Sequence, residues 1–128
     1  MSVVGDRATV STVTPMYNEE ECVEEFVRRT DFALQSLGSS YEIIVVSDGS
    51  KDSTESKLRQ LAERYPALRA FCLARNMGQC AAIDAGIQQS RGKWVVVLDG
   101  DLQNRPEDIP TLIAHAEQGN DLVSGRRC

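Results

Sequence analysis

Short apolar segments alternate with longer stretches of helical periodicity along most of this 128-residue chain. The apolar segments, rich in Val, Ile or Leu, are predicted strands: Ala8–Thr14, Glu42–Ser47, Arg69–Ala74, Lys93–Asp99 and Asp121–Ser124. The longer stretches are predicted helices: Glu19–Leu37, Ser53–Tyr65, Gly78–Ser90 and Pro106–Gln118. Because strands that alternate with helices over short connections form parallel sheets covered on both faces, we predict an α/β fold. Its expected form is an open three-layer α/β/α sandwich with a mainly parallel sheet.

The length of the chain suits a single domain, residues 1–128, with a core of its own. Hydrophobic residues make up 41% of the sequence, and no internal repeat or interdomain linker divides it. The last predicted strand is followed directly by Gly125–Cys128, with no further helix to cover it. We therefore expect the domain to be C-terminally truncated.

Composition excludes several classes of protein. The net charge of −5 provides no broad basic surface for nucleic acid, and Trp94–Leu98, the longest apolar run, is far shorter than the roughly 20 residues that span a bilayer. The N-terminus lacks the layout of a secretory signal. Cys22, Cys72 and Cys80 have no zinc-type spacing, so we predict buried, reduced thiols in a cytoplasmic protein.

Polar clusters follow every predicted strand. The carboxyl ends of parallel strands meet at one edge of a sheet, and α/β folds bind their ligands at that edge, so we predict a ligand site there. The candidate binding residues are, in chain order, Pro15, Tyr17, Glu19, Asp48, Gly49, Ser50, Arg75, Asn76, Gly78, Gly100 and Arg126.

Each of these clusters also has a plain structural interpretation. The segment that starts at Asp48 can be a turn and helix cap, or its carboxylate can accept a hydrogen bond from the N–H group of a base. Tyr17 can have a purely structural role at the exit from its strand, or it can offer a flat face to a base or ribose. Arg75 can belong to a surface turn or neutralise a phosphate. Asp84, in the middle of a predicted helix, fits a solvated side chain better than a ligand contact.

An acidic cluster follows the most apolar predicted strand. Trp94–Leu98 runs directly into Asp99, Gly100 and Asp101, and Gln103 lies two residues further on. A strand that looks buried on both faces can carry two carboxylates where it emerges into solvent, a ligand or a cation. Because Mg²⁺ prefers oxygen ligands and often binds phosphates as well, we predict that Asp99, Asp101 and Gln103 hold a metal. A solvated turn is the alternative.

The motifs at the strand ends resemble those of family 2 glycosyltransferases, which have the GT-A fold with a Rossmann-like nucleotide-binding half. The resemblance extends over residues 10–126 and is carried by Pro15-x-Tyr17-Asn18-Glu19-Glu20, Ser47-Asp48-Gly49-Ser50-x-Asp52-x-Thr54, Arg75-Asn76-x-Gly78 and Asp99-x-Asp101-Leu102-Gln103. Two segments, Arg75–Gln79 and Asp99–Glu107, are similar to the polyprenyl-phosphate branch of that family.

This resemblance implies an inverting transfer of a sugar from a nucleotide-diphosphate sugar, with Mg²⁺ or Mn²⁺ as cofactor. By position, Pro15, Tyr17, Glu19 and Asp48 would surround the base and ribose. Asp99 and Asp101 would act in catalysis through the metal, with Gln103 as a third ligand and Arg75 or Arg126 near the diphosphate. The cation would stabilise the charge that develops on the leaving nucleoside diphosphate.

In the polyprenyl-phosphate branch the acceptor is a lipid phosphate, which is already an anion at neutral pH. A strong general base is then less necessary, and we identify none. The resemblance implies a full-length protein at the cytoplasmic face of a membrane, and apolar surface left by a truncation could pair two copies as a homodimer. We expect this chain to be weak or inactive as a transferase.

Two other classes remain as alternatives. A non-catalytic fragment that binds nucleotide sugars would share every candidate residue. A receiver-type phosphoacceptor domain has similar alternation, but it needs an acidic pair after the first strand and a Lys after the fifth, where this chain has Pro15 and Arg126.

Overall fold

The computed structural model describes residues 10–38, 40–98, 106–111 and 113. Its elements are, in chain order, β1 (Val10–Met16), α1 (Val23–Gln35), β2 (Tyr41–Ser47), α2 (Thr54–Arg64), β3 (Leu68–Cys72), α3 (Gln79–Gln89), β4 (Trp94–Val97) and the 3-10 turn η1 (Pro106–Asp108). The predicted strand Asp121–Ser124 and the end of the predicted helix Pro106–Gln118 lie outside the described residues.

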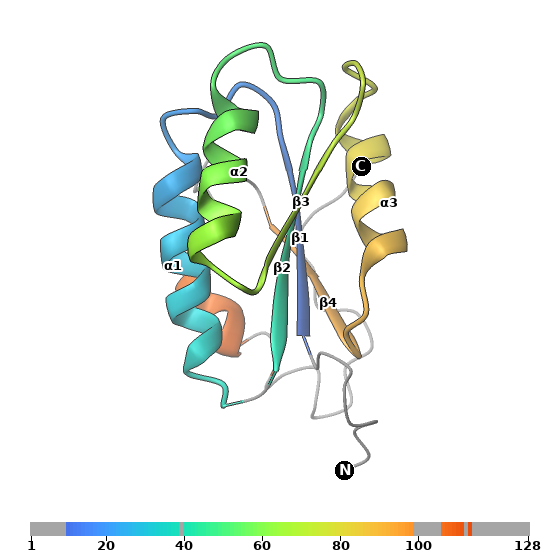
Figure 1. The fold of residues 1–128 in the computed structure, drawn as a ribbon. Helices are drawn as coiled ribbons and strands as arrows, with labels where there is room; N and C mark the ends of the chain where they lie inside the picture. The colour runs from blue at the N-terminus through green and yellow to red at the C-terminus, as the bar shows by residue number, and fades with distance from the viewer. Residues whose placement is uncertain (1–9, 39, 99–105, 112, 114–128) are drawn as a thin grey trace.

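The four strands form one parallel sheet in the order β3-β2-β1-β4. The helices α1 and α2 lie on one face of the sheet and α3 lies on the other (Figure 1). This arrangement confirms the predicted α/β/α sandwich with a parallel sheet. It also places the carboxyl ends of the strands together at one edge.

The core fills the two spaces between the sheet and its helices. The larger cluster lies beneath α1 and α2, and Phe26, Leu34, Ile43, Val45 and Leu58 are among its fully buried members. The smaller cluster, on the α3 face, contains Val13, Ile44, Val46 and Ala82. Successive residues of β2 therefore point into both clusters, which is why this strand is apolar throughout.

Helix α3 packs very close to the sheet at Gly86. A Cβ atom on Gly86 would lie 2.5 Å from Cγ1 of Val13 and 3.2 Å from Cγ2 of Val46. The absence of a side chain at this helical position therefore sets how closely α3 approaches β1 and β2.

Strand β4 differs from the prediction of a strand buried on both faces. Val96 is 5% exposed, but Val95 on the opposite face is 38% exposed. The reason lies in the packing: α3 covers β1 and β2, and β4 pairs with β1 alone among the described residues.

The predicted burial of the thiols is wrong. Cys72 and Cys80 are exposed and Cys22 is half-buried, and none of the three forms a disulfide bond with another described residue. Cys72 ends β3, at the border of the described sheet, and Cys80 lies on the outward side of the first turn of α3. An apolar residue type was a poor guide to burial at these two positions.

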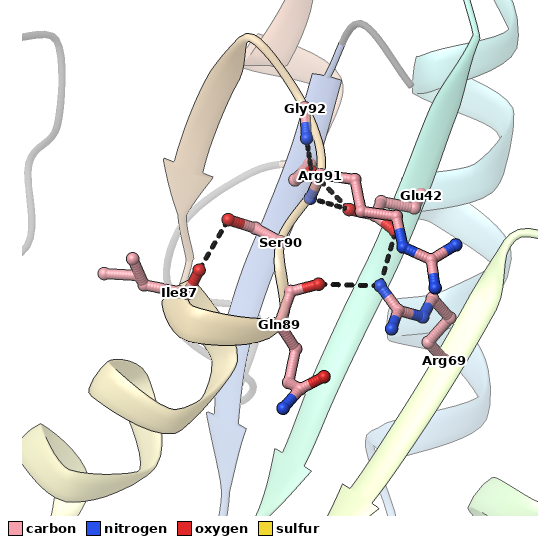
Figure 2. A network of polar contacts seen from close by, with 8 residues as sticks. Glu42, Arg69, Ile87, Gln89, Ser90, Arg91 and Gly92 are labelled. Atoms are coloured by element: carbon pink, nitrogen blue, oxygen red, sulfur yellow. Dashed lines mark hydrogen bonds and ion pairs between the residues drawn. The ribbon is translucent and has the colours of Figure 1, made fainter. Parts of the chain in front are cut away.

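At the opposite edge, the amino ends of the strands are joined by a buried carboxylate. Glu42 of β2 is 5% exposed and accepts hydrogen bonds from the Ser11 hydroxyl (2.6 Å), the Arg91 backbone N–H (2.6 Å) and the Arg69 guanidinium (2.8 Å). Figure 2 shows Arg69 and Arg91 converging on Glu42. Burial disfavours the charged form, but these hydrogen bonds and the charge of Arg69 outweigh it and lower the pKa of Glu42 below its ordinary value.

The same network holds the connection from α3 to β4. Arg69 also donates to the backbone carbonyl of Gln89 (2.8 Å), as Figure 2 shows. The Ser11 hydroxyl accepts from the N–H of Gly92 (2.8 Å). Glu42 thus fixes the point at which the chain leaves α3 and enters β4.

Among the described residues, no helix is long and apolar enough to cross a membrane.

Candidate functional site

Three loops meet at the carboxyl edge of the sheet, at the top of Figure 1. They are the β1–α1 loop (residues 17–22), the β2–α2 loop (residues 48–53) and the β3–α3 loop (residues 73–78). The predicted site residues Pro15, Tyr17, Glu19, Asp48, Gly49, Ser50, Arg75, Asn76 and Gly78 lie on these loops or beside them. The fold therefore brings this set together from three separate parts of the chain.

The β1–α1 and β2–α2 loops are joined by a reciprocal pair of hydrogen bonds. The backbone N–H of Asn18 donates to the Ser50 hydroxyl (3.1 Å), and the backbone N–H of Lys51 donates to Oδ1 of Asn18 (2.8 Å). Asn18 has a φ of 53°, a left-handed conformation that Asn tolerates better than most residues. Its side chain and backbone thus fix one loop against the other.

Further hydrogen bonds extend this junction to the start of α2. The backbone N–H of Glu19 donates to the Thr54 hydroxyl (2.9 Å), and that of Glu20 donates to Oδ2 of Asp52 (3.3 Å). In the other direction, the backbone N–H of Ser53 donates to Oε1 of Glu20 (2.9 Å). The two loops therefore behave as one hydrogen-bonded unit.

Asp52 is the central acceptor in this unit. Its Oδ1 accepts from both the N–H (2.9 Å) and the hydroxyl (2.6 Å) of Thr54, at the first turn of α2. Burial works against the charged form, but the hydrogen bonds from Thr54 and Glu20 prevail and lower the pKa of Asp52. The sequence predicts a helix cap in this segment, but it does not reveal that Asp52 also bridges to the preceding loop.

A cluster of hydroxyls lies beneath Ser50. The Ser47 hydroxyl donates to Oε2 of Glu55 (2.9 Å) and lies 2.9 Å from the Ser50 hydroxyl. Since Ser47 is fully buried at the end of β2, it provides a fixed support for Ser50. Ser50 in turn accepts from the β1–α1 loop, as described above.

Asp48 connects the β2–α2 loop to the β3–α3 loop. Its side chain is buried, with 4% of the residue exposed. Oδ1 accepts from the N–H of Met77 (2.7 Å), and Oδ2 accepts from the N–H of Gly78 (3.0 Å) and from Nδ2 of Asn76 (3.1 Å). The Asn76 amide also donates to the backbone carbonyl of Asp48 (3.1 Å).

The same two loops approach each other backbone to backbone at Gly49. A Cβ atom there would lie 2.4 Å from the carbonyl carbon of Arg75 and 2.4 Å from the nitrogen of Asn76. Gly49 also has a φ of +71°, which L side chains rarely adopt. A larger residue would therefore force the two loops apart.

The outward side of the three loops carries exposed groups of mixed character. Tyr17 is 41% exposed and Met77 is 52% exposed. The guanidinium of Arg75 is also exposed, and its Nε lies 3.3 Å from Sδ of Met77, which is a weak acceptor. Asp84 is exposed on α3 and accepts from Nε2 of Gln88 (2.9 Å), in agreement with a solvated side chain.

The remaining predicted site residues follow β4. The N–H of Leu98 donates to the carbonyl of Val13 (3.0 Å), so pairing between β1 and β4 continues to the residue before the acidic cluster. The predicted residues Asp99, Gly100, Asp101, Gln103 and Arg126 lie outside the described residues.

Beyond that gap, η1 is attached to α1 by a bidentate ion pair. Nε and Nη2 of Arg29 donate to the two carboxylate oxygens of Glu107 at 2.8 and 2.7 Å. Within the described part of the chain, no group of three or more His, Cys, Asp or Glu side chains could hold a metal ion.

Comparison with known proteins identifies this architecture. The model of the family "Glycosyl transferase family 2" matches residues 11–127. A protein of Pseudomonas paraeruginosa named undecaprenyl-phosphate 4-deoxy-4-formamido-L-arabinose transferase is 51% identical over 119 residues, which are 92% of this chain and 35% of that protein. A protein of the same name from Pseudomonas savastanoi is 50% identical over 115 residues. The chain thus spans about a third of the length of the curated relatives it matches.

Two solved structures are similar to most of this chain. A mannosyltransferase of Pyrobaculum calidifontis in complex with GDP-Man and Mn²⁺ matches with a TM-score of 0.70 and 25% identity, over 85% of this chain and 32% of that one. Glucosyl-3-phosphoglycerate synthase of Mycobacterium tuberculosis, in complex with phosphoglyceric acid, matches with a TM-score of 0.66 and 26% identity, over 90% of this chain and 41% of that one.

Proposed function

Because this chain belongs to glycosyl transferase family 2, we propose that it binds a nucleotide-diphosphate sugar and takes part in transferring the sugar to a polyprenyl phosphate. The observation that carries the proposal is the junction of three loops at the carboxyl edge of the sheet. It gathers an exposed aromatic ring, a buried carboxylate and an exposed guanidinium, on Tyr17, Asp48 and Arg75. These are chemically suited to a base, its N–H group and a phosphate, respectively.

In this proposal the base and ribose lie among Pro15, Tyr17, Glu19 and Asp48. Asp48 has capacity for this role: a carboxylate offers about four acceptor positions, and three described donors reach it. Gly49 and Ser50 shape the floor of the β2–α2 loop. Arg75, Asn76 and Gly78 form the part of the site nearest to the phosphates.

We assign the metal to Asp99, Asp101 and Gln103, with Gly100 and Arg126 near the diphosphate. Carboxylate and amide oxygens suit Mg²⁺ or Mn²⁺, and the pairing of β4 with β1 up to Leu98 supports a position for this segment beside the three loops. When bound, the cation would offset the charge on the leaving nucleoside diphosphate.

The acceptor assignment follows the relatives, whose printed names specify undecaprenyl phosphate. A phosphate oxygen is already ionised at neutral pH, so it can attack the sugar with inversion without a strong general base. We place the full-length protein at the cytoplasmic face of a membrane, where its lipid acceptor would lie. A homodimer stays a prediction from the sequence alone.

A titration with UDP and GDP, each with and without Mn²⁺, tests donor binding by calorimetry. We expect one of the two nucleotides to bind, and to bind more tightly with Mn²⁺. Tyr17→Ala should weaken that binding about fivefold or more, since stacking of a base on an aromatic ring contributes ~1–3 kcal/mol.

Phe32→Ala is the matched control, because Phe32 lies on α1 and is 72% exposed, so it should leave nucleotide binding unchanged. Absence of binding to either nucleotide would refute the proposed donor site. Binding that is equally tight without Mn²⁺ would refute the metal assignment.

A second assay separates transfer from binding. The chain would be incubated with a nucleotide sugar that binds, Mn²⁺ and undecaprenyl phosphate, and the lipid-linked product would be measured. Turnover supports the transferase. Binding without turnover would instead support a non-catalytic nucleotide-sugar-binding fragment.

A further inference from the structure

We propose that Asp48 is a positioning residue that sets the shape of the β3–α3 loop and thereby places Arg75 at the edge of the site. Asp48 lies on the β2–α2 loop, about 30 residues away in the sequence. Its carboxylate nevertheless receives three described hydrogen bonds from the β3–α3 loop, two of them from backbone N–H groups. This role is separate from any contact with a ligand.

The two backbone bonds fall at the entrance to α3. Gly78 is the residue before the first turn of this helix, and Met77 precedes it. No side chain from this segment caps the helix. The Asp48 carboxylate accepts from the N–H of Gly78, at the N-cap position, and from that of Met77 before it, so it holds the chain at the point of entry into α3 and does not cap the N–H groups of the first turn.

The loop has little else to hold its shape. The side chains of Ala74, Arg75, Asn76 and Met77 are all exposed, so apolar burial contributes little between the end of β3 and the start of α3. In contrast, Asp48 is almost completely buried, and its hydrogen bonds to the loop are partly buried. The polar contacts to this one carboxylate are therefore the main restraint that the structure provides.

Two glycines make the restraint specific to one loop shape. Gly78 has a φ of +104°, which disfavours any other residue, so the chain turns sharply where it meets Asp48. Gly49 allows the backbone of Arg75 and Asn76 to approach within a distance that a Cβ atom would block. The loop is thus seated on Asp48 and Gly49 together.

The consequence for binding rests on the proposed function. A loop that already has its final shape loses less conformational entropy when a nucleotide binds, so its order raises affinity without a new contact. The role of Asp48 in ordering the loop of the nucleotide-free chain, however, does not depend on the proposed function. The two parts can be measured separately.

The first experiment measures amide hydrogen exchange in the ligand-free chain. In Asp48→Asn the NH₂ group of Asn takes the place of Oδ2 and faces the two N–H donors from which Oδ2 accepts hydrogen bonds in the parent chain. Because two donors cannot bond to each other, the loop should open more often. We expect exchange at the Met77 and Gly78 N–H groups to rise about tenfold, as loss of a charge-assisted bond of ~1.5 kcal/mol implies. Exchange at Val45 of the core strand β2 should stay unchanged.

Asp84→Asn is the matched control. It removes the same charge from an exposed carboxylate on α3 and should leave exchange at Met77 and Gly78 as in the parent chain. If Asp48→Asn changes these two amides no more than Asp84→Asn does, the proposal is overturned. If Asp48→Asn instead speeds exchange throughout the sheet, the fold is damaged and a gentler variant decides.

That variant is Asn76→Ala, which removes one exposed donor and leaves Asp48 in place. We expect exchange at Gly78 to rise about threefold, because Asn76 gives the loop two further hydrogen bonds to Asp48, one to Oδ2 and one to the backbone carbonyl, and their loss should let the loop open more often. Unchanged exchange at Gly78 in a folded Asn76→Ala protein would overturn the proposal as firmly as the first result.

The second experiment titrates the same variants with UDP and GDP in the presence of Mn²⁺. If Asp48 and Asn76 act through one loop, the double variant should bind no more weakly than Asp48→Asn alone. Additive losses would overturn the positioning role in binding. If the parent chain binds neither nucleotide, the proposed function fails, while the exchange measurement still decides whether Asp48 orders the loop.

Discussion

Replacing Glu42 with Gln should destabilise the fold through a single lost ion pair. Gln has the shape of Glu, so it creates no cavity. One oxygen of Glu42 accepts from Ser11 and Arg91, and the other accepts from Arg69. The amide oxygen of Gln can serve only one of these sides, and its NH₂ group must then face a donor on the other.

The arrangement that loses least keeps the oxygen on the side of Ser11 and Arg91, because the backbone N–H of Arg91 cannot turn away. The NH₂ group then faces Arg69, whose side chain is 24% exposed and still donates to the carbonyl of Gln89. A hydrogen bond to a charged group contributes about 1.5–3 kcal/mol. Because Arg69 keeps its hydrogen bond to Gln89 and stays partly hydrated, we expect the free energy of unfolding to fall by about 2 kcal/mol, near the lower end of this range.

Urea unfolding at pH 7 measures this loss. With an m-value of about 2 kcal/mol per molar, the midpoint of Glu42→Gln should fall by about 1 M. Glu24→Gln is the control: Glu24 pairs with Arg64 at 3.3 Å, but the side chains are 65% and 59% exposed. That surface pair should contribute less than about 0.5 kcal/mol.

The pH dependence provides a second, independent check. The folded pKa of Glu42 lies below its ordinary value of 4.5, so its stabilising contribution is complete above that value and is lost as the pH falls through the folded pKa. The difference between the parent chain and Glu42→Gln should therefore shrink below pH 4.5. We expect the free energies of unfolding of the parent chain and Glu42→Gln to differ by ~2 kcal/mol at pH 7. A difference below about 0.5 kcal/mol, or one that does not shrink in acid, would refute this reasoning.

Two further predictions concern packing between the sheet and its helices. The Thr12 hydroxyl is fully buried without a hydrogen-bond partner among the described residues. Thr12→Val should therefore raise the free energy of unfolding, measured by urea denaturation, by up to about 1 kcal/mol. A clear decrease would show that the hydroxyl has a partner. Gly86→Ala adds a Cβ atom 2.5 Å from Val13, and this overpacking (about 1–3 kcal/mol) should exceed the gain in helix propensity of about 1 kcal/mol. The loss should be partly relieved when Val13→Ala is added, and strictly additive effects of the two changes would contradict the proposed clash.

The architecture was predictable because it depends on local patterns. The apolar run of β2, from Ile43 to Val46, is buried on both faces, as expected of a central parallel strand. Burial of single residues was less predictable. Helix α1 buries Thr30 and leaves Phe32 72% exposed, although residue type alone would favour Phe32 for the core. Val95 is exposed because cover from α3 depends on strand order, which an apolar run does not contain.

At the candidate site, the sequence could predict which edge carries the polar residues but not how they contact one another. The choice for Asp48 lay between a local cap and a base contact. Its observed partners are Asn76, Met77 and Gly78, almost thirty residues further along the chain. Spacing within a motif cannot reveal such a contact, because it depends on β2 and β3 being neighbours in the sheet.

The hydrogen bonds between the loops also restrict how a diphosphate could be held. The backbone N–H groups of Asn18, Lys51, Met77 and Gly78 all point to acceptors within the protein. A phosphate could use them only by breaking the bonds that hold the loops together. The guanidinium of Arg75 is different, because it is exposed and its described contact is a thioether sulfur. Positive charge for an anionic ligand must therefore come from side chains such as Arg75, or from a bound cation, more than from the backbone of these loops.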